Sequence, residues 1–75
     1  MIETLELITV QPTPAGWRVT CDGRCVSQHF ASGATAEAAA RQLGGAIARG
    51  GQPAEIRIFL RDGSLAGRFA CAPGR

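Results

Sequence analysis

Three cysteines and one histidine are the residues of this 75-residue chain that could support metal or thiol chemistry. Cys21, Cys25, His29 and Cys71 could in principle be a zinc ligand set. Cys25 and His29, however, lie four residues apart in a segment with strand composition, which separates them by about 13 Å at ~3.3 Å per residue. Zinc ligands lie only about 2.0–2.3 Å from the ion. The spacing therefore argues against a metal site, and we expect no cofactor.

The same side chains offer little for catalysis. His29 is the only histidine, and no local motif places a serine or cysteine nucleophile beside it. An odd number of cysteines favours free thiols over disulfides in a cytoplasmic protein. Residues 1–15 lack the basic start and apolar block of a signal peptide, and no apolar run approaches the ~18–20 residues of a membrane span. We expect a cytoplasmic protein without enzyme activity, with no evident small-molecule substrate and no membrane partner.

Two Asp-Gly pairs predict two β-hairpins, because both central residues of a type I′ turn need positive φ. Asp22-Gly23 and Asp62-Gly63 would each form a two-residue loop. The segments on either side of these pairs are rich in β-formers and predict strands over 17–21, 24–31, 54–61 and 64–70. A further run of β-formers predicts a first strand over 4–11.

The predicted loops also set the pairing of the strands. In the first hairpin, a two-residue loop places Val19 opposite Val26. In the second, Leu60 faces Leu65, Ile58 faces Gly67 and Ile56 faces Phe69 on the apolar side, and Phe59 faces Ala66 on the other. Loops one residue longer would mix apolar and polar side chains on one face.

A helix is predicted between the two hairpins, from an N-cap at Thr35 to about Arg49. Glu37 would lie in its first turn and pair with Arg41 at i,i+4 spacing. Gly44-Gly45 in its interior costs about 1 kcal/mol per residue against alanine, which we explain by a close approach of helix to sheet. The apolar stripe consists of Ala36, Ala40, Leu43 and Ile47.

These elements predict an α+β fold of order βββαββ: a single antiparallel-rich sheet covered on one face by one helix. The chain would form one small domain over residues 1–75, with 72–75 as a loose tail. Whether the second hairpin docks beside the first strand or the third is left open. A chain of this length buries only about 60–65% of its unfolded surface, so its stability should be marginal without help.

Three motifs resemble the small bacterial family called domain of unknown function 2188. They are the G-W-x-V of 16–19, the F-x(4)-T-x-E-A-A-x-x-A-R run of 30–41 and the R-D-G-x-L of 61–65. The resemblance spans nearly the whole chain; it implies this fold and no activity. Residues 17–48 are also loosely similar to plant AP2-type and integrase-type DNA-binding domains, which read DNA with the face of a three-stranded sheet.

The open face of the predicted sheet is the candidate interaction face. Strand one adds either Leu5 and Leu7 or Ile8 and Val10 to it. Arg57 lies directly opposite Arg68, a destabilising like-charge pair. The charged, aromatic and imidazole side chains predicted for the face are Arg18, His29, Arg57, Phe59, Arg61 and Arg68, joined by Thr20, Cys25 and Ser27.

Two functions follow from this face. In the first, the face or an exposed edge strand forms a homodimer that hides the apolar residues and lets acidic residues offset the arginines. In the second, it binds a nucleic-acid backbone, with Phe59 or His29 stacking on bases. Eight arginines against six acids give a net charge of only +2, so we favour the homodimer.

Overall fold

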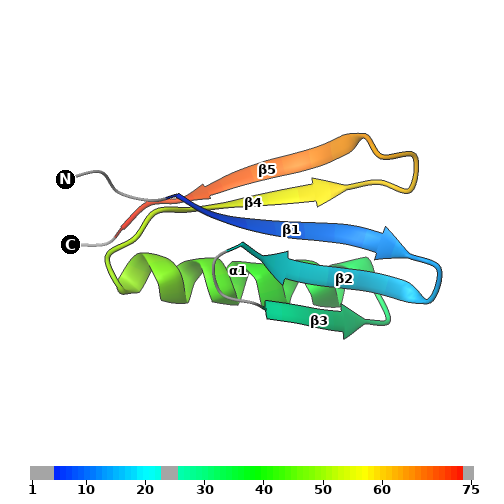
Figure 1. Cartoon of the computed structure of the whole chain (residues 1–75), viewed down its shortest axis with the longest axis horizontal. Helices are drawn as coiled ribbons and strands as arrows, with labels where there is room; N and C mark the ends of the chain where they lie inside the picture. The colour runs from blue at the N-terminus through cyan, green and yellow to red at the C-terminus, as the bar shows by residue number, and fades with distance from the viewer. Residues whose placement is uncertain (1–4, 23–25, 74–75) are drawn as a thin grey trace.

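In the computed structural model, five strands form one sheet and a single helix covers one of its faces (Figure 1). The structure describes residues 5–22 and 26–73. The elements are β1 (Glu6–Thr13), β2 (Gly16–Cys21), β3 (Val26–Phe30), α1 (Gly33–Arg49), β4 (Ala54–Phe59) and β5 (Leu65–Cys71). The predicted α+β class and element order are confirmed.

The order of strands in the sheet is β3-β2-β1-β4-β5. The second hairpin therefore docks beside β1, which pairs with β4 in parallel, whereas every other neighbouring pair is antiparallel. β1 is the central strand. Residues 72–73, the described part of the predicted tail, belong to no helix or strand.

β1 continues past residue 11, where we predicted it to end before Pro12. Pro12 pairs with Trp17 of β2, and the strand extends to Thr13. The Asp22 N–H donates to the Leu7 carbonyl at 3.0 Å, so the odd positions of β1 exchange backbone hydrogen bonds with β2. The nitrogen of Pro12 faces the other side, where the ladder with β4 has already ended at Val10. The missing N–H therefore costs no bond to β2.

The predicted register of the first hairpin is wrong by two residues. Cys21 pairs with Val26, and Val19 pairs with Gln28 rather than Val26. The longer loop brings Trp17 opposite Phe30, and aromatic cross-strand pairs stabilise a sheet. An even shift keeps every side chain on its predicted face. The predicted two-residue turn falls partly outside the described residues.

The second hairpin follows the prediction only away from its turn. Ile56–Phe69, Arg57–Arg68 and Ile58–Gly67 pair as expected, but a bulge follows and Phe59 pairs with Leu65. The predicted Leu60–Leu65 and Phe59–Ala66 pairs are therefore wrong.

The turn itself explains the change. The Leu60 N–H donates to the Ser64 carbonyl at 2.9 Å and the Gly63 N–H to the Leu60 carbonyl at 2.9 Å. Gly63 has φ +87°. This is a three-residue loop with glycine in the left-handed position, a common alternative to the two-residue turn.

The N-cap lies three residues before the predicted one, and the helix begins at Gly33. Ser32 is the N-cap, because its Oγ accepts from the Thr35 N–H at 3.1 Å. Glu37 therefore lies beyond the first turn, contrary to expectation. Its predicted pair with Arg41 is present at 2.8 Å. The helix ends as expected at Gly50-Gly51, where Gly51 has φ +97°.

The core lies between α1 and the sheet. The largest fully buried side chains are Ile8, Val10, Val19 and Ile56. The predicted close approach occurs at Gly44, where an added methyl group would lie 2.8 Å from the Cys71 Sγ and 3.3 Å from the Ile56 Cδ1. Gly45 has no such neighbour in the sheet. The helix therefore needs the first glycine of the pair and not the second.

Candidate functional site

The face of the sheet opposite α1 brings most of the predicted site residues together. Arg18 of β2 pairs with His29 of β3, and Arg57 of β4 pairs with Arg68 of β5. Thr9 of the central strand separates the two basic pairs, since it pairs with Thr20 on one side and Arg57 on the other. Alternation along β4 adds Phe59 to this face, and Arg61 lies in the turn that follows.

A carboxylate that sequence reasoning missed relieves the like-charge pair. The Glu55 Oε2 accepts from the Arg57 Nε at 2.6 Å and lies 3.9 Å from the Arg68 Nε. The Glu55 side chain is only 17% exposed, against 39% for Arg57 and 62% for Arg68. The sequence held the signal, because residues two apart on a strand share a face. The three side chains form one cluster with a net charge of only +1.

Arg18 is placed differently from the other arginines. Arg18 is half-buried. Its Nε is buried and has no hydrogen-bond partner among the described residues. His29, directly opposite, is exposed. This second basic pair has no carboxylate beside it in the described part of the chain comparable with Glu55.

The open face also carries apolar side chains at the end where β1 begins. The pairing of β1 with β2 and β4 buries Ile8 and Val10 under the helix, so Leu7 points to the open face together with the neighbouring Leu5. Leu5 is 51% exposed and Leu7 is half-buried. Glu55 lies between Leu7 and Ala70, because it pairs with Leu7 on one side and with Ala70 on the other, and Ala70 is exposed. We call Leu5, Leu7 and Ala70 the apolar patch.

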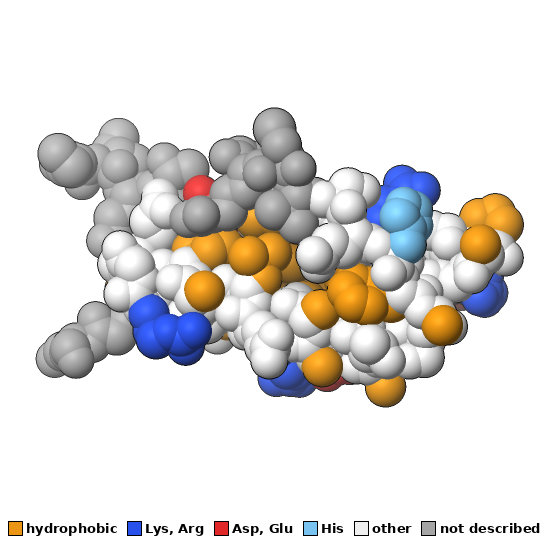
Figure 2. Space-filling model, turned by 90° about the horizontal axis from the view of Figure 1, so that it is seen from below, with side chains coloured by type: hydrophobic (Ala, Val, Ile, Leu, Met, Phe, Trp, Pro, Cys, Tyr) orange, Lys and Arg blue, Asp and Glu red, His pale blue; other side chains and the backbone are white. Residues whose placement is uncertain are grey.

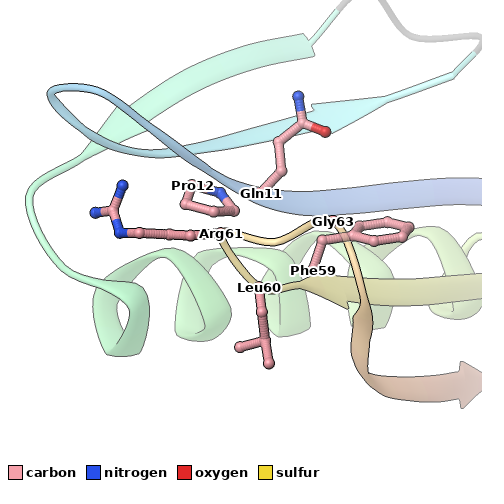
Figure 3. A pocket seen from close by; sticks show the side chains of 6 residues that line it. All are labelled: Gln11, Pro12, Phe59, Leu60, Arg61 and Gly63. Atoms are coloured by element: carbon pink, nitrogen blue, oxygen red, sulfur yellow. The ribbon is translucent and has the colours of Figure 1, made fainter.

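Phe59 lies at the other end of the face, in a pocket of about 340 Å³ between the tip of the β1–β2 hairpin and the tip of the β4–β5 hairpin, which we call the two hairpin tips. Figure 3 shows the Arg61 side chain running past Pro12, the Phe59 ring on the opposite side, and Leu60 pointing away. The Arg61 Nη1 donates to the Thr13 carbonyl at 3.2 Å and so joins the two hairpin tips. The lining residues are Gln11, Pro12, Phe59, Leu60, Arg61 and Gly63.

The structure separates the side chains considered for zinc. Cys21 is buried on the helix-covered face, whereas His29 is exposed on the open face. No group of three or more histidine, cysteine, aspartate or glutamate side chains converges among the described residues. Cys21 and Cys71 form no disulfide among the described residues, and the Cys21 Sγ donates to the Glu6 Oε1 at 3.5 Å. Cys25 lies outside the described residues.

Trp17 belongs to the core side of the sheet. It packs against the buried cluster, and an added methyl group on Gly33 would lie 3.1 Å from its ring. It is therefore not available for stacking on the open face. Seen from below Figure 1, the molecule shows a band of hydrophobic side chains along its middle (Figure 2).

α1 lies mainly over β1, β4 and β2. It covers β3 only in part: Phe30 packs against the core cluster, whereas Gln28 is exposed although it pairs with the buried Val19. In the described part of the chain no helix is long and apolar enough to cross a membrane.

No family model matches the chain, and neither curated proteins nor solved structures include a significant match.

Proposed function

We propose that this protein is a non-catalytic interaction module that forms a homodimer through the apolar end of its open sheet face. The observation that carries the proposal is the apolar patch of Leu5, Leu7 and Ala70, which lies on a sheet face without a second layer. Leu5 alone leaves 51% of its surface in water. Covering Leu5 would stabilise the dimer by about 25 cal/mol for each Å² of apolar surface removed from water.

The size of the chain supports the same function. A domain of this length has little stability to spare. A second copy that binds only the folded state adds stability by mass action. Dimer formation would therefore contribute to the stability of the fold as well as to its assembly.

The charged cluster beside the patch suits a two-fold interface. Glu55 and Arg68 lie two residue pairs apart in the β4–β5 ladder, and their contact of 3.9 Å is long. In an isologous dimer each surface meets its own copy, so Arg68 of one chain could bind Glu55 of the partner subunit. The interface would therefore combine the apolar contact of the patch with ion pairs made at Glu55, the carboxylate that lies between Leu7 and Ala70.

Nucleic-acid binding is the competing function. Glu55 neutralises one of the two positive charges of Arg57 and Arg68, which lowers the attraction of this cluster for phosphate. Arg18 and His29 have no comparable carboxylate beside them among the described residues, but they form a single basic pair at the β3 edge. The internal carboxylate lowers the basic charge available, and we therefore place self-association first.

The test compares two exposed leucines. Leu5→Glu introduces a charge into the apolar patch, whereas Leu60→Glu introduces the same charge at the β4–β5 turn, where leucine is 48% exposed. Sedimentation equilibrium should show that Leu5→Glu weakens the dimer about tenfold or more, since 1.4 kcal/mol corresponds to tenfold in affinity. Leu60→Glu should assemble like the unmodified protein.

Equal effects of the two substitutions on the dimer would reject the patch as the interface. A salt-titrated binding assay with random single-stranded DNA addresses the competing function. A monomer whose DNA affinity falls steeply with salt and with Arg18→Ala would replace self-association by nucleic-acid binding.

A further inference from the structure

We propose that the pocket between the two hairpin tips binds a small organic acid with an aromatic or aliphatic end, such as an arylalkyl carboxylate. This inference goes beyond self-association and does not depend on it. The pocket lies about six residues along β1 from the apolar patch, which is roughly 20 Å on a strand. In Figure 1 the two hairpin tips lie together at the end opposite the termini.

The pocket exists because two sequence features stop the central ladder. β1 and β4 pair in parallel only as far as Val10 and Ile58. Pro12 lacks the N–H with which β1 could bond to β4 beyond that point. The bulge at Ile58/Phe59 then redirects the β4–β5 hairpin. The two hairpins part, and the space between them is the pocket.

The walls of the pocket are apolar on one side. Phe59 is half-buried, which leaves part of its ring open to a ligand, and Pro12 is also half-buried. Gly63 contributes no side chain, and the space beside its Cα is open. A volume of about 340 Å³ is at the lower end of the ~300–1,000 Å³ typical of ligand pockets. The ligand should therefore carry one ring or a short chain.

The other side of the pocket carries a cation with unused donors. Arg61 spends one N–H on the Thr13 carbonyl, and the guanidinium has five. The neighbouring carboxylate, Asp62, bonds through its Oδ1 to Ser64 instead, accepting from the Ser64 N–H at 2.9 Å and the Ser64 Oγ at 2.6 Å. Arg61 is exposed, and its remaining N–H groups can bind a carboxylate in a bidentate manner.

The separation of the two features defines the ligand class. Figure 3 shows the Phe59 ring and the Arg61 guanidinium at opposite ends, with Pro12 between them. The matching ligand is elongated, with its apolar group at one end and its anion at the other. A single arginine suits one carboxylate better than the several negative charges of a nucleotide. The amide of Gln11, which points away from β1 at the rim, is a further polar group for orientation.

The experiment is an amide-resolved NMR titration with 4-phenylbutyrate as the probe. Saturable shifts should centre on Gln11 and Gly63, with a dissociation constant of about 1 mM for a ligand of this size. Arg61→Gln should weaken binding about tenfold or more, because a charged hydrogen bond is lost. Arg49→Gln removes the same charge from the end of α1 and should leave binding unchanged.

Two comparisons test the carboxylate site: the acid against an alcohol of the same shape, and the unmodified protein against Arg61→Gln. The alcohol 4-phenylbutan-1-ol lacks the anion and should bind at least about tenfold more weakly. Equal binding of the alcohol, or full binding by Arg61→Gln, would overturn the carboxylate site. So would shifts spread over the whole sheet without saturation. The dimer-defective Leu5→Glu protein should bind the probe normally, which separates this site from the dimer interface.

Discussion

At the scale of single residues, carboxylates determine how the arginines of this protein can act. Glu55 bonds to Arg57 and approaches Arg68, so a pair that would repel across two strands is held together. Asp62 instead turns to Ser64 and leaves its neighbour Arg61 free to bond to Thr13. The first arrangement reduces the net charge of the cluster to +1, and the second leaves Arg61 as an available cation.

The Asp62 contact gives a prediction at this scale. The side-chain hydrogen bond from Ser64, with the backbone bond from the same residue, lowers the pKa of the Asp62 carboxyl below its ordinary value of 3.8. Removing the hydroxyl by Ser64→Ala should raise that pKa towards the ordinary value, measured by NMR titration. Because the folded pKa is the lower one, the contact favours folding above about pH 3.8 and loses its effect as pH falls through the folded value. An unchanged pKa in Ser64→Ala would show that the side-chain bond is absent.

At the scale of elements, the distance between α1 and the sheet is set by one glycine of a pair. Gly44→Ala should destabilise the fold by about 1 kcal/mol, because the cost of overpacking exceeds the gain in helix propensity. The added methyl group would lie 2.8 Å from the Cys71 Sγ. Gly45→Ala meets only the Arg49 guanidinium at 3.4 Å and should stabilise the protein by up to about 1 kcal/mol. Urea denaturation measures both, and opposite signs for the two variants are the expected result. Stabilisation by both would mean that the helix lies farther from the sheet.

Features that depend on the pattern within one helix or strand could be predicted from the sequence. Helical spacing identified the buried face of α1, and strand alternation placed Arg57 and Arg68 on one face. The Asp-Gly pairs predicted hairpins correctly but not their loop lengths. Aromatic pairing of Trp17 with Phe30 favours a longer first loop. Such choices depend on contacts between strands, which no local motif encodes.

The candidate site was predictable only in part for the same reason. Which apolar pair of β1 faces the open side depends on the parallel pairing with β4, a contact between residues about 50 positions apart in the chain. The pocket depends on the same pairing, since it lies where that ladder ends. Glu55, in contrast, could have been recognised two residues before Arg57 on the same strand.

At the scale of the whole molecule, one sheet face presents two different surfaces at its two ends. The apolar patch lies near the start of β1, and the pocket lies between the hairpin tips. A dimer formed at the first end leaves the second accessible, so assembly and ligand binding can occur together. The central claim is that the apolar patch is covered by a second copy.

The solution mass of the unmodified protein at micromolar concentration, determined by light scattering, tests that claim most directly. We predict twice the 7.8 kDa of one chain, with dissociation on dilution and a melting temperature that rises with protein concentration. A mass of one chain at every concentration, with a melting temperature that does not change, would contradict it.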